Sequence, residues 1–147
     1  MSFESVLLMA NTTSTWLMCG VIWIVQVVHY PLFARYEREA FSKIMRQHQA
    51  RIAGVVAGPM IVEFVTSCLL LYWRPTSIPS WQAWLGLVCV LVCGLSTLFV
   101  VIPVHDKLEN LGFHETILRQ LITRNWSRTI AWTLHAILCG IMLLECL

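Results

Sequence analysis

The chain has 147 residues, of which 58% are hydrophobic and only 12% are charged, and its mean hydropathy is +0.72. A soluble domain of this length carries about a quarter charged residues, so the composition excludes an ordinary soluble protein and indicates one that has the lipid bilayer as its solvent. The net charge of +2 argues against nucleic-acid binding, and the length allows one domain, residues 1–147.

Four apolar runs follow one another along the chain, at residues 12–33, 52–73, 81–104 and 129–147. Each reaches the roughly 20 residues that a helix needs to cross the hydrocarbon core, where backbone groups must bond to one another within a helix. We expect no cleavable signal in the first run, since no basic segment precedes it. The sequence therefore predicts an all-α, polytopic four-helix bundle with up-down topology, because short connections favour antiparallel neighbours.

The basic residues predict the orientation of the bundle. Nine of the ten Lys and Arg lie in residues 35–51 and 107–128, and the tenth, Arg74, lies in a short loop. Because cytoplasmic loops are rich in Lys and Arg, we expect these two segments in the cytoplasm and both termini outside, in a bacterial inner membrane. Their composition is helical, so we expect them to extend the spanning helices past the membrane or to lie along its surface.

Two segments of the chain resemble each other. Residues 31–37 and 103–109 both read P-x-x-x-[KR]-x-E, and a basic stretch follows each. One interpretation is a tandem repeat of two helical hairpins, related by an axis along the membrane normal. The other is coincidence, because prolines and charges are common where helices leave a membrane.

Three ionisable residues stand out inside the apolar runs: His29, Glu63 and His135. Such groups are costly in lipid, so they usually face the bundle interior and serve a function. With Arg35 and Arg128 as markers of the inner interface, a rise of 1.5 Å per residue places His29 about 9 Å deep and His135 about 10 Å deep. The two histidines are thus predicted to share one layer on two different helices.

The same count from Arg51 places Glu63 about 18 Å deep, near the midplane. Residues three or four apart lie on one helix face, and this spacing predicts three inward stripes. We expect them to form a polar pocket in the cytoplasmic half, with Arg51, His105 and Arg128 at its mouth. The stripes are Gln26, His29 and Phe33; Pro59, Glu63 and Thr66; and Arg128, Trp132, His135 and Cys139.

These groups suggest a membrane-embedded oxidoreductase or oxygenase-type enzyme acting on a hydrophobic substrate. Two histidines at equal depth, His29 and His135, can ligate the iron of haem b; together with His105 they can instead hold a non-haem transition metal. Glu63 would carry a proton, while Arg51 and Arg128 would attract an anionic group. A cofactor-free variant stays open, in which Glu63 abstracts a proton and His29 or Arg128 stabilises the anion.

Two other functions also fit the sequence. A midplane carboxylate with histidine neighbours suits the proton relay of a proton-coupled transporter or channel, and a chain of four helices would then have to assemble as a homo-oligomer. In a structural or assembly subunit, the histidines would instead only bond to neighbouring helices.

The motifs "GVIWIVQVVHYPLF", "RQHQARI", "GPMIVE", "VIPVHDKLE" and "RNWSRTIAWTLHAIL" resemble a group of small bacterial four-helix membrane proteins of uncharacterised activity. This resemblance spans nearly the whole chain and implies the same topology. In size and helix count only, the chain also resembles anthrone-oxygenase-like membrane proteins, which favours an enzyme. The motif positions that the first resemblance singles out are His29, His48, Arg51, Glu63, His105, Asn125, Trp126, Arg128 and Trp132.

Overall fold

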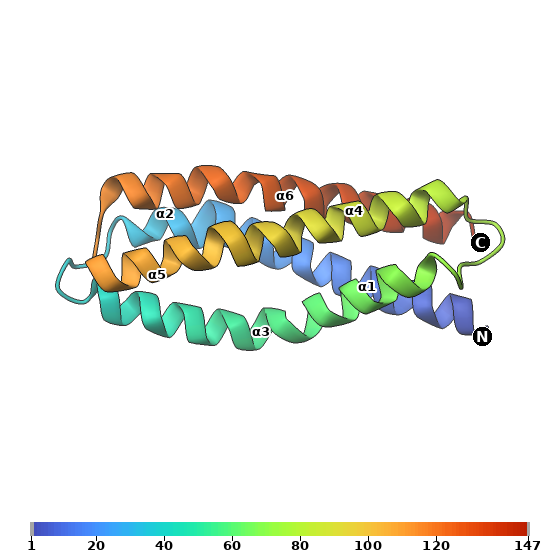
Figure 1. Ribbon diagram of the computed structural model, residues 1–147, viewed down its shortest axis with the longest axis horizontal. Helices are drawn as coiled ribbons and strands as arrows, with labels where there is room; N and C mark the ends of the chain where they lie inside the picture. The colour runs from blue at the N-terminus through green and yellow to red at the C-terminus, as the bar shows by residue number, and fades with distance from the viewer. Residues whose placement is uncertain (1, 147) are drawn as a thin grey trace.

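Most of each apolar run lies within a longer helical rod, and four such rods pack side by side along the long axis of the molecule (Figure 1). The second rod ends at Leu70, three residues before the predicted end of its span at residue 73. The computed structural model describes residues 2–146. All four rods are long and apolar enough to cross a membrane, which confirms the predicted four-helix fold and supports an integral membrane protein. Leu147, the end of the predicted fourth span, lies outside the described residues. The rods are Phe3–Phe33, Phe41–Leu70, Ser80–Leu111 and Glu115–Leu144.

Two of the four rods contain a short segment of π-helix. The first rod consists of α1 (Phe3–Ile24), η1 (Val25–His29) and α2 (Tyr30–Phe33), and the second is α3 (Phe41–Leu70). The third consists of α4 (Ser80–Ser96), η2 (Thr97–Val101) and α5 (Ile102–Leu111), and the fourth is α6 (Glu115–Leu144).

The rods reach beyond most of the predicted spans. The helix of the first rod begins at Phe3 rather than at residue 12. The Ser2 hydroxyl caps this helix by accepting a hydrogen bond from the Ser5 N–H. The second and fourth rods begin at Phe41 and Glu115, so residues 41–51 and 115–128 are helical, in agreement with the expected extension of the spanning helices.

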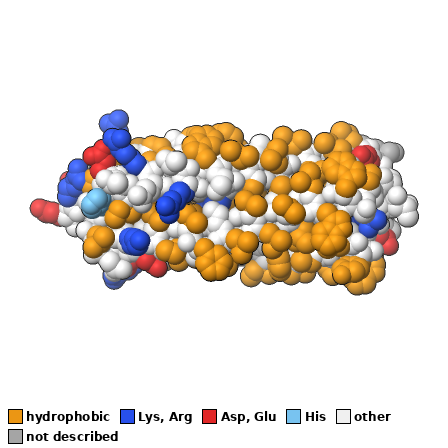
Figure 2. Space-filling view, turned by 45° about the horizontal axis from the view of Figure 1, so that its top comes forward, with side chains coloured by type: hydrophobic (Ala, Val, Ile, Leu, Met, Phe, Trp, Pro, Cys, Tyr) orange, Lys and Arg blue, Asp and Glu red, His pale blue; other side chains and the backbone are white. Residues whose placement is uncertain are grey.

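The topology is up-down. α1 packs against α3 and α6, and α4 packs against the same two helices on the other side of the bundle. One end carries both termini and the loop of residues 71–79, and the other carries the connections at 34–40 and 112–114 (Figure 1). We call these the terminal end and the basic end. Figure 2 shows most of the charged side chains gathered toward one end and a broad apolar belt along the rest of the surface.

Each π-helical segment ends two residues before a proline. In place of the usual α-helical bond, the Tyr30 N–H donates to the Val25 carbonyl, and the Ile102 N–H donates to the Thr97 carbonyl. A proline clashes with the carbonyl four residues before it in a regular α-helix, and the wider turn gives that carbonyl room. The first and third rods therefore share one local construction at the two matched prolines, Pro31 and Pro103.

The interior has two apolar clusters separated by a polar layer. One cluster, toward the basic end, includes Met18, Phe41 and Trp132, and the other, toward the terminal end, includes Leu8 and Leu138. Between them lies a set of buried polar side chains from three rods. Its members are Asn11, Thr15, Glu63, Thr66, Ser67 and His135.

Candidate functional site

A cavity of about 590 Å³ lies between the rods in the half of the bundle toward the basic end. We call it the polar cavity. Met18, Ile22, Val56 and other apolar side chains from the first three rods form most of its wall. Polar side chains from all four rods gather at one part of the wall. These are Tyr30, His48, Gln49, His105 and Arg128, and Thr97 is a further polar residue of the lining.

The π turn η1 decides which residues of the first rod face the interior. The sequence spacing predicts that His29 follows Gln26 on the inner face, but His29 is exposed while Gln26 and Tyr30 are buried. The π turn holds one more residue than an α turn, so the side chain four positions after Gln26 takes the inner place. The predicted stripe of Gln26, His29 and Phe33 is therefore wrong at His29.

Arg128 is buried in the wall of the polar cavity, with only 7% of its surface exposed. Its Nη1 donates to Asn125 Oδ1 at 2.9 Å, and Asn125 Nδ2 donates to Gln26 Oε1 at 2.7 Å. The guanidinium lies over the Trp132 ring, 5.1 Å from its centroid. These contacts hold the arginine in place without neutralising its charge.

No carboxylate among residues 2–146 pairs with Arg128, whose Nε also lacks a hydrogen-bond partner. A buried charge without a counter-charge is costly, and a buried donor without an acceptor adds to that cost. The guanidinium is therefore poised for a negatively charged or strongly accepting group inside the polar cavity.

Three histidines form a row from the surface to the polar cavity. His29 is exposed, His48 is half-buried and His105 is only 5% exposed. The ring centroids are 5.9 Å apart for His29 and His48, and 5.7 Å apart for His48 and His105. His105 also meets the Tyr30 ring edge-on, and its Nε2 has no hydrogen-bond partner. A titratable group without a partner thus lies in the same wall as Arg128.

Glu63 is the centre of the polar layer. Its Oε1 accepts from Thr15 Oγ1 at 3.0 Å and lies 2.9 Å from His135 Nδ1, and its Oε2 accepts from Trp132 Nε1 at 2.9 Å. Its backbone carbonyl accepts from Asn11 Nδ2 at 3.2 Å. One residue therefore connects the first, second and fourth rods, and both of its carboxylate oxygens have partners.

The close approach of α4 to this centre depends on Gly86. A Cβ atom at that position would lie only 3.0 Å from His135 Nε2. By contrast, a Cβ atom at Gly94, on the same helix, would have no heavy atom within 4 Å. The glycine thus lets α4 pack directly against the His135 ring.

The structure does not bring His29 and His135 together. His135 Nδ1 lies 3.4 Å from Thr15 Oγ1, and the helix from Thr15 to His29 is about 20 Å long. The equal depth predicted for the two histidines is wrong because it places Arg128 at the inner interface. Arg128 is instead buried, well over three turns beyond the start of α6 at Glu115.

The expected metal ligands likewise come from separate places. Among residues 2–146, no group of three or more His, Cys, Asp and Glu side chains is arranged to hold a metal ion. His105 faces the polar cavity, His29 lies outside it and His135 bonds to Glu63. Among the described residues, the side chains expected to bind haem or a metal ion therefore do not come together as one set of ligands.

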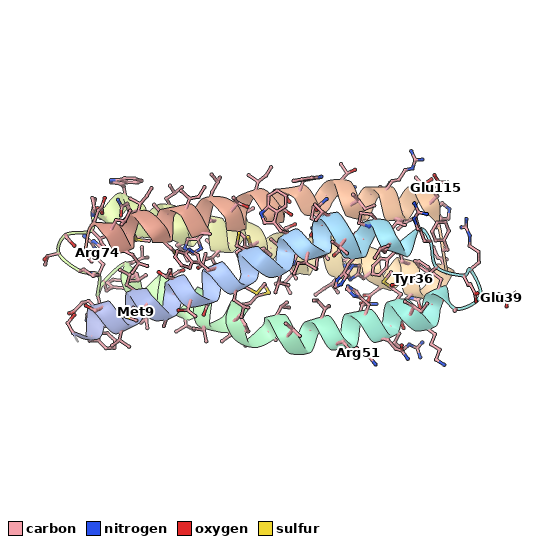
Figure 3. The ribbon with its side chains drawn as sticks, turned by 180° about the vertical axis from the view of Figure 1, so that it is seen from behind. Met9, Tyr36, Glu39, Arg51, Arg74 and Glu115 are labelled. Atoms are coloured by element: carbon pink, nitrogen blue, oxygen red, sulfur yellow. The ribbon has the colours of Figure 1, made fainter. Side chains whose placement is uncertain are left out.

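Arg51, predicted at the mouth of the pocket, is exposed and projects away from the bundle (Figure 3). It shares a shallow hollow with His29 rather than lining the polar cavity. Sequence reasoning missed Tyr30, Asn11 and Thr15. The spacing of four between Asn11 and Thr15 places both on one helix face, but the predicted span began only at residue 12.

Comparisons of this chain with protein-family models, with curated proteins and with solved structures give no match.

Proposed function

We propose that the chain is a membrane-embedded enzyme that binds a hydrophobic substrate in the polar cavity and removes a proton from it. The observation that carries this proposal is a pair of buried, unpartnered nitrogen atoms, Arg128 Nε and His105 Nε2, in the wall of one cavity. Buried polar atoms in proteins are nearly always hydrogen-bonded, and a catalytic role is one of the reasons for an exception.

Arg128 stabilises the anion that the substrate becomes. A fixed positive charge in a water-poor site favours developing negative charge far more than the same charge does in water. The bonds from Asn125 and the Trp132 ring fix the guanidinium before substrate arrives, so it needs little reorganisation. Enols, phenols and carboxylic acids are substrates whose conjugate bases such a site would favour.

His105 is the base in this proposal. A base must lie within hydrogen-bond reach of the proton that it takes. His105 lines the polar cavity together with Arg128, and its Nε2 has no hydrogen-bond partner. The proton then leaves through His48 and exposed His29, whose rings continue the row to the surface.

Glu63 acts as a positioning residue rather than as the base. Both of its oxygens are engaged, and one of them fixes the Trp132 indole that lies beneath Arg128. His135 and Thr15 hold the other oxygen. The carboxylate therefore orients the aromatic ring that supports the anion-binding guanidinium.

We also propose that the basic end lies in the cytoplasm of a bacterial cell and that both termini lie outside. Eight of the ten Lys and Arg lie in residues 35–51 and 107–124, within or beside the two connections at that end, and the positive-inside rule relates such a bias to orientation. In this arrangement His29 releases its proton on the cytoplasmic side.

The anion-stabilising site can be tested with 1-naphthol, whose naphtholate form has its own absorption band. The protein is placed in phosphatidylcholine nanodiscs at a pH where free 1-naphthol is neutral. We expect wild-type protein to produce a saturable naphtholate band and Arg128→Gln to lose it. Arg128→Lys, which keeps the charge, is expected to retain part of the band.

Arg124→Gln is the matched control, because Arg124 is exposed on the same helix. This substitution also removes one positive charge, but at the surface rather than in the cavity wall. It is expected to leave the naphtholate band unchanged. The proposal fails if wild-type protein gives no band, or if folded Arg128→Gln gives a band of wild-type size. Circular dichroism of each variant establishes that the helices are intact.

A further inference from the structure

A second cavity, of about 380 Å³, lies beside the polar cavity, between α3 and α4. We call it the apolar cavity, because Phe64, Val90, Leu91 and other hydrocarbon side chains form nearly all of its wall. Glu63 and Trp132 also line it, and they are bonded to each other. The apolar cavity therefore suits a hydrocarbon chain.

The two cavities meet at a junction of three side chains. Met60, Ile61 and Leu98 line both of them. The outer side of this junction is open to the surroundings, since Ile61 is 64% exposed and Leu98 is 58% exposed. Both residues belong to membrane-spanning rods, so lipid chains lie against them. A molecule dissolved in the bilayer thus reaches both cavities sideways, without passing through water.

The combined length of the two cavities indicates a long ligand. The lining extends along α3 from His48 in the polar cavity to Phe64 in the apolar cavity. That stretch of helix is about 24 Å long, against a hydrocarbon core of about 30 Å. A short aromatic substrate would fill only part of this space, whereas a long alkyl or isoprenoid chain would follow all of it.

We infer that the natural substrate is a single-chain amphiphile, with an acidic head group at Arg128 and His105 and a long apolar chain that crosses the junction into the apolar cavity. The inference rests on the proposed function, because it takes the polar cavity as the place where the head group binds. The chain supplies most of the binding free energy and the arginine fixes which end enters.

The polar lining favours one acidic group on one chain. Among residues 2–146, Arg128 is the only Lys or Arg in the wall of the polar cavity. One negative charge on the ligand therefore neutralises it. The two cavities share three lining side chains and are therefore adjacent, so one chain would have to pass between these side chains. A two-chain phospholipid would have to leave its second chain outside and bring its bulky phosphate into a buried site.

Displacement of bound naphtholate by palmitate and by octanoate, each corrected for its partition into the nanodisc, tests the chain length. Wild-type protein is expected to bind palmitate at least about tenfold more tightly than octanoate, because the longer chain buries more methylene groups. Leu98→Trp places a large ring at the junction. It is expected to reduce this preference to about threefold or less.

Ile137→Trp is the matched control, because Ile137 is also exposed on a spanning rod but belongs to neither lining. It is expected to keep the wild-type preference. Equal affinities for the two acids, or an unchanged preference in Leu98→Trp, overturn the long-chain inference. The proposed function survives that result, since octanoate still displaces naphtholate. Two-chain phosphatidate that competes as well as palmitate overturns the single-chain inference.

A second measurement does not depend on naphthol. Palmitate with a diazirine at the end of its chain is photoactivated in the nanodisc, and the labelled residues are found by mass spectrometry. We expect label on Phe64 or Leu91 in the apolar cavity, and less of it in Leu98→Trp. Label scattered evenly over lipid-facing residues, with no excess at these two, overturns the inference.

Discussion

Glu63 and His135 share a hydrogen bond of 2.9 Å between Oε1 and Nδ1, and both side chains are only 1% exposed. The bond joins α3 to α6 at the layer between the two apolar clusters. Thr15 and Trp132 donate to the same carboxylate. Because an apolar surrounding strengthens hydrogen bonds and makes unmet ones costly, this carboxylate sets how three of the four rods align.

Glu63→Leu is therefore expected to destabilise the fold strongly. It leaves the Trp132 indole, the Thr15 hydroxyl and the His135 ring without their acceptor, and removing one partner of a buried pair costs about 3–5 kcal/mol. Denaturant unfolding in detergent micelles measures the change. Glu115→Leu, which breaks the exposed ion pair with Arg119, should cost about 1 kcal/mol or less. Similar losses for the two variants would contradict this role of Glu63.

Two glycines on α4, Gly86 and Gly94, give a second test of the packing around Glu63 and His135. Gly86→Ala would place a methyl group 3.0 Å from His135 Nε2, so the His135 ring or α4 must shift. We expect a loss of about 1–3 kcal/mol, as for other overpacked interiors. Gly94→Ala has open space and should be neutral or stabilising by up to about 1 kcal/mol, because alanine is the better helix former. A Gly86→Ala protein as stable as Gly94→Ala would show that the contact is soft.

The sequence was sufficient to predict the four spanning helices, because long apolar runs leave few alternatives in lipid. It also predicted the inner stripe of α6, where Arg128, Trp132, His135 and Cys139 are all buried. The lengths of the rods were harder, since the polar segments that extend them carry no hydropathy signal. Their helical composition was the signal that proved correct.

The sequence was not sufficient to predict which side chains make the contacts between helices. A π turn inserts one residue, so every face after it moves, and this moved His29 out of the bundle and Tyr30 into it. Pro31 and Pro103 were visible in the sequence, but a proline is compatible with a kink as well as a π turn. The depth of His135 was misjudged for another reason: a buried arginine is indistinguishable in sequence from one at the interface.

Asn125→Ala is expected to weaken anion binding without unfolding the protein. Its amide accepts from Arg128 and donates to Gln26, so the variant frees the guanidinium to move. A hydrogen bond to a charged group contributes about 1.5–3 kcal/mol, and we expect about tenfold weaker naphtholate binding in the nanodisc titration. Ser127→Ala, at an exposed position nearby on α6, should bind as wild type does. Unchanged affinity in folded Asn125→Ala would exclude this positioning role.

His48→Phe tests the histidine row as a path for protons. The phenyl ring keeps the edge-on packing of His48 against Phe33 and Tyr30 but cannot accept or pass a proton. The extent of naphtholate formation should stay near that of wild type, since Arg128 and His105 remain. Its rate after rapid mixing should fall about tenfold or more, because a positioned acid–base group typically contributes at least that much. His114→Phe changes an exposed histidine outside the row and should leave the rate unchanged. Equal rates for the two variants would mean that the proton leaves the polar cavity by another route.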